Sequence, residues 1–158
     1  ELRRNDESYK FYMPLSDKKH LDLIKEPLED LVKVSFNNSQ EVLSNCEIGI
    51  ITSGTATLEA SLLRTPCVTL YKTGWLSYRL IKPLLQIDHF SLPNLLAGKE
   101  LLPELLQDEV NVKNIINAIE KISLKGLDYY YKEFHAIHEN LKAGSSETAA
   151  KEISHLID

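Results

Sequence analysis

Residues 47–64 constrain the fold more than any other part of the sequence. A nearly continuous apolar run at 47–52 is followed by Ser53-Gly54-Thr55 and then by apolar residues at helical spacing over 56–64. The apolar run predicts a strand that is covered on both faces, and a second apolar strand follows at 67–71. A strand, a helix and a strand in this order indicate an α/β fold with a mainly parallel sheet.

The rest of the chain extends this pattern in both directions. Strands are predicted at 9–15 and 31–36, each followed by residues that cap helices, Ser16-Asp17 and Asn37-Asn38-Ser39. After residue 71 the pattern becomes helical, with a loop through Leu92-Pro93-Asn94. The predicted helices there cover 75–85, 100–107, 112–122, 127–141 and 146–157. No repeat or linker divides the 158 residues, so we expect one domain, 1–158, whose sheet is wrapped by C-terminal helices.

Charge and cysteine content exclude several classes of protein. The chain has 18 Lys and Arg against 23 Asp and Glu, a net charge of −5, whereas a general nucleic-acid binder needs a basic surface. Cys46 and Cys67 match no metal-ligand or redox spacing, which indicates buried free thiols in a reducing compartment. His135 and His138 lie three apart without a third ligand, so no metal site is predicted. No run approaches the roughly 20 apolar residues that span a bilayer, and we expect a cytoplasmic protein.

The turn Ser53-Gly54-Thr55 is the most site-like part of the sequence. In an open parallel sheet, ligands bind beyond the carboxyl ends of the strands, where a helix N-terminus presents free N–H groups to an anion. Gly54 allows the backbone to approach a phosphate closely, and Ser53 and Thr55 offer hydroxyl donors. Glu59 follows Thr55 by one helical turn and suits the hydroxyls of a ribose. An ordinary N-cap turn followed by a solvated glutamate explains the same residues.

Basic and aromatic residues gather in an acid-free stretch, residues 60–87. There Trp75, Tyr78, Arg79 and Lys82 belong to a short amphipathic segment, a composition that suits a helix at a lipid headgroup boundary. This interpretation predicts that the four residues contact a membrane surface. A core helix whose cations reach the solvent explains the same composition.

Two blocks of the sequence resemble the lipid-A-disaccharide synthase family. The first is Ile51-Thr52-Ser53-Gly54-Thr55-Ala56-Thr57-Leu58-Glu59-Ala60; the second is Phe90-Ser91-Leu92-Pro93-Asn94-Leu95-Leu96-Ala97-Gly98-Lys99-Glu100, with Pro103-Glu104-Leu105-Leu106-Gln107 after it. The similarity runs over nearly the whole chain, and the Ser-Leu-Pro-Asn-Leu-Leu-Ala-Gly part is the more family-specific. The resemblance implies the C-terminal, Rossmann-like half of an inverting GT-B glycosyltransferase that needs no metal or other cofactor.

The reaction implied by the resemblance joins two acylated glucosamines. The sugar of UDP-2,3-diacylglucosamine is transferred to 2,3-diacylglucosamine 1-phosphate, which releases UDP and forms the lipid A disaccharide. The residues placed around the UDP-sugar are Ser53, Gly54 and Thr55 at the pyrophosphate, Glu59 at the ribose, and Asn94 and Gln107 in the donor pocket. From spacing alone, Asn94 is also explained as a turn residue and Gln107 as a polar residue at a helix end. Both substrates are acylated, so the implied place of action is the inner face of the bacterial inner membrane; whether two copies form a homodimer is left open.

The chain departs from the family pattern in what it lacks. The family's N-terminal domain, with the acceptor site and a catalytic acid, is not in the sequence, nor is the Leu-Pro-Gly-Ser-Arg stretch that opens the nucleotide domain. The resemblance therefore implies an incomplete donor-binding domain without its first, normally central strand, without a catalytic residue and inactive by itself. Two alternatives stay open: another UDP-sugar GT-B enzyme, such as a peptidoglycan N-acetylglucosaminyl transferase, and a non-catalytic α/β module that binds a membrane or a partner.

Overall fold

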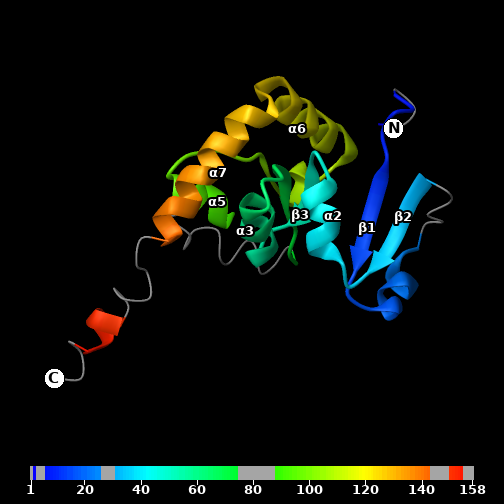
Figure 1. Ribbon diagram of the computed structural model, residues 1–158. Coiled ribbons are helices and arrows are strands. Elements are labelled where there is room, and N and C mark those ends of the chain that lie inside the picture. Colours follow the sequence, from blue (N-terminus) through cyan, green and yellow to red (C-terminus); the bar gives the residue numbers. More distant parts are fainter. Residues whose placement is uncertain (1, 3–5, 26–30, 75–87, 143–149, 155–158) are drawn as a thin grey trace.

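Two separate parallel sheets organise the computed structural model of this chain (Figure 1). In the first, β1 (Phe11–Leu15) pairs with β2 (Val32–Phe36). In the second, the strand order is β3 (Gly49–Thr52), β4 (Cys67–Tyr71) and β5 (Glu104–Leu106). The structure describes residues 2, 6–25, 31–74, 88–142 and 150–154. Parallel strands alternating with helices confirm the predicted α/β fold.

The central strand of the second sheet, β4, is the most deeply buried element. Its first three residues, Cys67, Val68 and Thr69, have no exposed surface, as is typical of a parallel strand covered on both faces. β3 differs, because Ile50 is 49% exposed. The prediction of cover on both faces is therefore wrong for β3, whose Ile50 and Thr52 are both exposed, although it describes β4 well.

Three helices supply the cover of this sheet. They are α3 (Thr55–Leu62), α6 (Val112–Lys125) and α7 (Leu127–Lys142). α6 packs against β4, while α7 contacts α3, α6 and α5 (Leu92–Ala97). Figure 1 shows α6 and α7 following one another around the three-stranded sheet. The buried residues of α7 recur every third or fourth position and are Tyr130, Phe134 and Ile137. The predicted helical wrap is thus confirmed.

Two predictions between residues 92 and 107 are wrong. The predicted loop is α5 (Leu92–Ala97), because Pro93 stands in the first turn of the helix, where its missing N–H costs nothing, and Gly98 ends the helix at φ 63°. The predicted helix at 100–107 is instead strand β5, followed by a short 3-10 helix, η3 (Gln107–Glu109). Pairing of β5 with β4 outweighs the helical propensity of its leucines.

The N-terminal part is joined to the rest by α2 (Ser39–Asn45), which contacts both β1 and α3. Between the first two strands lies a 3-10 helix, η1 (Lys18–Leu23), where an α-helix was expected; the predicted cap is confirmed, since Asp17 accepts a hydrogen bond from Lys19 N. The predicted helix at 75–85 lies outside the described residues. So does most of 146–157, of which 150–154 is helical.

Candidate functional site

The turn Ser53–Thr55 connects the carboxyl end of β3 to α3, as predicted. Ser53 N donates to Leu70 O at 2.7 Å, which fixes the turn to the next strand. Gly54 has φ 157° and ψ −168°, a conformation open essentially to glycine alone, and a Cβ added there would meet no described atom within 4 Å. No described side chain caps α3. Thr57 N donates to Gly54 O at 3.1 Å, so the first-turn amides without a helical partner or cap among the described residues are those of Thr55 and Ala56, an arrangement that suits an anion.

The hydroxyl of Ser53 already has a partner inside the protein. It donates to the carbonyl oxygen of Phe90 at 3.1 Å. Because a serine hydroxyl carries a single proton, Ser53 cannot donate to Phe90 and to a phosphate at once. The donors left for an anion are the backbone N–H groups of the turn and the hydroxyl of Thr55, which is exposed.

Glu59 lies on α3 one turn beyond Thr55, on the same side of the helix. Its Oε1 accepts a hydrogen bond from Gln40 Nε2 of α2 at 2.7 Å. This contact is exposed, so a ligand hydroxyl can compete with Gln40 for the carboxylate. The role of Glu59 at a ribose stays a prediction.

Gln107 reaches the same edge of the sheet from the end of β5. Its Oε1 accepts from Thr73 N at 3.3 Å, and its backbone has φ 52°, a left-handed conformation rarely taken by glutamine. Its Nε2 is buried without a hydrogen-bond partner among the described residues. Because β3, β4 and β5 are adjacent and parallel, Ser53, Thr73 and Gln107 follow neighbouring strand ends. The structure thus brings Gln107 to the edge where the turn lies.

Asn94 lies in the interior, and its side chain has no exposed surface. Its Oδ1 accepts from Leu101 N at 3.0 Å and from Leu102 N at 2.8 Å, and its Nδ2 donates to Leu102 O at 2.8 Å. What the structure shows is a residue that ties α5 to the segment before β5. A direct contact between Asn94 and a donor sugar stays a prediction.

Sequence reasoning assigned no role to three residues that organise this edge: Thr73, Phe90 and Glu104. Thr73 offers only its backbone N–H, which no sequence pattern reveals. Phe90 and Glu104 stand inside the blocks that resemble the family, but their contacts are made through the backbone of residues 90 and 91. The one signal in the sequence that pointed to Glu104 is its position beside two apolar residues, Leu105 and Leu106, in a short strand.

Comparison with known proteins covers both sequence blocks that resemble a family, 51–60 and 90–107. The model of the lipid-A-disaccharide synthetase family matches residues 1–156, nearly the whole chain. The chain belongs to the lipid-A-disaccharide synthase family. The resemblance seen in the two sequence blocks is therefore confirmed.

Three lipid-A-disaccharide synthases show how far the similarity extends. The protein of Idiomarina loihiensis is 38% identical over 119 residues, which are 75% of this chain and 31% of its own. That of Pseudomonas paraeruginosa is 38% identical over 120 residues, 76% of this chain and 32% of its own. That of Pseudoalteromonas translucida is 34% identical over 165 residues, 100% of this chain and 43% of its own. The chain thus spans 31% to 43% of the length of these synthases.

The membrane segment predicted from the sequence falls on residues that the structure does not describe. Trp75, Tyr78, Arg79 and Lys82 lie outside the described residues. Within the described part of the chain, no helix is long and apolar enough to cross a bilayer.

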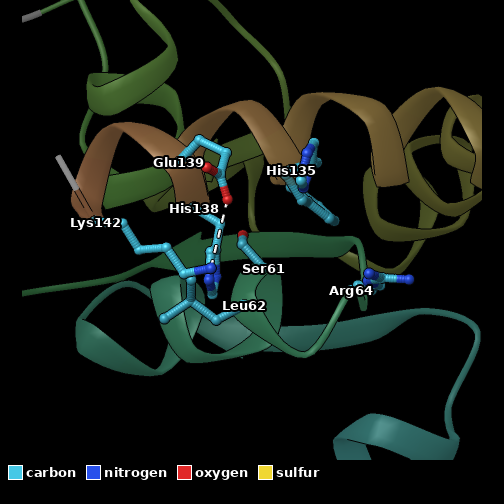
Figure 2. A pocket seen from close by; sticks show the side chains of 8 residues that line it. Ser61, Leu62, Arg64, His135, His138, Glu139 and Lys142 are labelled. Atoms are coloured by element: carbon cyan, nitrogen blue, oxygen red, sulfur yellow. Dashed lines mark hydrogen bonds and ion pairs between the residues drawn. The ribbon is translucent and has the colours of Figure 1, made fainter.

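A pocket of about 210 Å³ lies at the far end of α3 from the turn (Figure 2). The residues that line it come from α3 and its C-terminal end and from α7, and are Ser61, Leu62, Arg64, Phe134, His135, His138, Glu139 and Lys142. Glu139 is paired with Lys142 at 3.5 Å. The cations stand near the C-terminal ends of two helices, whose dipoles favour positive charge. None of the lining residues belongs to the Ser53–Thr55 turn, so the pocket is distinct from the candidate donor site. Among the described residues, no three potential ligands gather around a metal position.

Proposed function

We propose that this chain is the donor-binding part of a lipid-A-disaccharide synthase. The whole enzyme would transfer 2,3-diacylglucosamine from UDP-2,3-diacylglucosamine to 2,3-diacylglucosamine 1-phosphate, with release of UDP. The observation that carries the proposal is the uncapped start of α3 behind Gly54, at the carboxyl edge of a parallel sheet. Membership of the family supports the choice of a nucleotide sugar over other anions.

The proposed contacts follow the geometry of this edge. The turn amides and the Thr55 hydroxyl hold the pyrophosphate, while Ser53 fixes the turn through Phe90. Glu59 exchanges its bond with Gln40 for the ribose hydroxyls. The unpartnered Nε2 of Gln107 donates to an acceptor on the ligand, and Asn94 shapes the wall of the donor pocket from inside.

We also propose that the donor-binding domain is completed by a strand from elsewhere in the longer protein. β1 and β3 each have an unpaired edge among the described strands, and both sheets are wholly parallel. Figure 1 shows β1 on the side of its pair that faces α2 and β3. Apolar side chains are exposed on these two strands, Tyr12 at 44% and Ile50 at 49%. A strand between β1 and β3 would pair both edges and join the sheets.

We propose that the chain alone is inactive as a transferase. The acceptor site and the catalytic acid are assigned to the family's N-terminal domain, and general acid–base help is typically worth about 10²–10⁴-fold in rate.

We further propose that the inner face of the inner membrane, where both acylated substrates reside, is contacted by Trp75, Tyr78, Arg79 and Lys82. Co-sedimentation of Arg79→Glu/Lys82→Glu with anionic vesicles tests this, and light scattering tests whether two copies associate.

Titration with UDP tests the proposed function. Gly54→Ala should weaken UDP binding by about tenfold or more, because the turn cannot keep its shape with a Cβ. Gly126→Ala is the matched control: Gly126, at the end of α6, has φ 80° and ψ 150°, and a Cβ there also meets no described atom within 4 Å. Both variants should lose about 1–3 kcal/mol of stability, but only the first should lose affinity. No saturable binding of UDP by the parent protein, or equal affinity of the two variants, would contradict the proposal.

A further inference from the structure

Glu104, in β5, has a carboxylate whose bonds run to the backbone of another segment. Its Oε1 accepts from Ser91 N at 2.8 Å and from Phe90 N at 3.3 Å, and its Oε2 accepts from Phe90 N at 3.2 Å. His89 Nδ1 lies 3.9 Å from Oε2. The side chain of Glu104 is only 8% exposed, so these bonds are shielded from water and hold the segment 89–91 against the sheet.

Phe90 connects this carboxylate to the turn at the start of α3. Its N–H bonds to Glu104, and its carbonyl oxygen accepts the hydroxyl of Ser53 at 3.1 Å. The ring of Phe90 also packs against that of Tyr71 at the end of β4, with centroids 5.8 Å apart. A single residue therefore links the carboxyl ends of β3 and β4 to the first residue of β5.

We infer that Glu104 is a positioning residue for the nucleotide site, acting through Phe90 on Ser53; this inference rests on the proposed function. With Phe90 held by Glu104, its carbonyl keeps the Ser53 hydroxyl engaged and fixes the first residue of the turn. The amides that follow then keep one orientation before the anion binds, so binding does not cost the conformational entropy of ordering them. Glu104 itself contacts no ligand in this arrangement.

The hydrogen bonds, rather than the negative charge, carry this effect. Oε1 alone reaches both N–H groups, and a glutamine at this position keeps one oxygen able to accept them. Glu104→Gln should therefore retain UDP affinity to within about threefold, whereas Glu104→Ala should weaken it by about tenfold or more.

A double-mutant cycle separates positioning from a general loss of stability. Glu104→Ala and Ser53→Ala act on the same link, so the double variant should bind UDP no more than about twofold more weakly than Glu104→Ala alone. Glu133→Gln is the control, because Glu133 also joins two segments, through Lys99 at 2.8 Å, but lies away from the turn. It should leave UDP affinity unchanged. Additive losses in the cycle, or an equal loss in Glu104→Ala and Glu133→Gln, would overturn the inference.

Amide hydrogen exchange at Ser53 and Thr57, whose N–H groups bond to Leu70 O and Gly54 O, provides a readout without any ligand. Exchange there should be about tenfold faster in Glu104→Ala than in Glu133→Gln, because the turn has lost its link to Phe90. If the parent protein does not bind UDP, the proposed function fails, and this measurement alone decides the positioning role. Equal exchange rates at Ser53 and Thr57 in the two variants would overturn it.

Discussion

The two sheets of this chain use the same kind of strand in very different surroundings. β1, β2 and β4 each have five residues and parallel neighbours. In β4 the first three residues are fully buried, whereas none of the described residues of β1 and β2 is buried. The difference lies in the cover, since α3, α6 and α7 enclose the second sheet and the first has its main contact with α2.

This contrast indicates that strand pairing alone does not stabilise the fold. Two paired strands are marginal in water, and parallel sheets normally depend on helices over both faces. The buried core consists of residues from β4, α3, α6, α7 and the segment before β5. We therefore expect the β1–β2 sheet to open more readily than the β3–β4–β5 sheet.

Hydrogen exchange should show the largest difference between the sheets. Amides of Val68 and Thr69 in β4 should exchange only on global unfolding, while those of Tyr12 and Val34 exchange through local opening. A difference of at least about 1,000-fold in protection is expected, given the usual stability of a domain. Similar protection in the two sheets, measured by NMR or mass spectrometry, would show that the first sheet is not the weaker one.

A matched pair of phenylalanines sharpens the comparison. Phe134 of α7 is 2% exposed within the core, whereas Phe36 at the end of β2 is only partly buried. Phe134→Ala should cost about 3–5 kcal/mol of unfolding free energy, because it leaves a cavity. Phe36→Ala should cost about 1 kcal/mol. Urea unfolding followed by circular dichroism measures both, and equal losses would contradict the contrast.

Alkaline pH should weaken the covered region specifically. Burial raises the pKa of Cys67 from 9.0 to about 12 and is the main cause that raises the pKa of Tyr130 from 10.0 to about 12. Because both groups lose their protons more readily in the unfolded chain, stability is full below pH 9 and falls between about pH 9 and 12. Tyr130→Phe should make the fall in the urea midpoint shallower above pH 10. An unchanged slope in that variant would exclude Tyr130 as a cause.

The smallest effect is expected where α2 meets the covered region. Thr65 is buried, and its hydroxyl donates to Leu43 O at the end of α2 at 2.6 Å. Thr65→Val should cost about 0.5–1 kcal/mol, because Leu43 O loses one of its two hydrogen bonds and keeps the one from Cys46 N at 3.1 Å. Thr52→Val, at an exposed position, should change stability by less than about 0.5 kcal/mol. If the two variants are equally stable, the Thr65 bond contributes nothing to the junction.

Local sequence patterns predicted most of the described strands and helices. The strands β1 to β4 and the helices α2, α3, α6 and α7 lie where the apolar pattern placed them, although Asn38, at the N-cap position of α2, makes no side-chain cap bond. The pattern failed at 92–107, where Pro93 begins a helix and a short leucine run pairs with β4. A three-residue strand has no period to detect, and its assignment depends on a partner about 35 residues earlier in the chain.

The candidate site was predictable in its backbone and not in its side-chain contacts. The strand–turn–helix at Ser53–Thr55 follows from local sequence, and so does the side of α3 on which Glu59 lies. Ser53 was expected to donate to a phosphate, whereas its proton goes to Phe90, 37 residues later. Contacts of this kind follow from the tertiary arrangement, which sequence spacing does not encode.

Among the described strands, β3 has an unpaired edge, and this affects how the protein behaves in concentrated solution. An open strand edge pairs with any extended segment that fits, including the same edge of another molecule. Ile50 adds an exposed apolar side chain to that edge. We therefore expect that self-association of the chain, where it occurs at high concentration, begins at the same edge that would accept a completing strand.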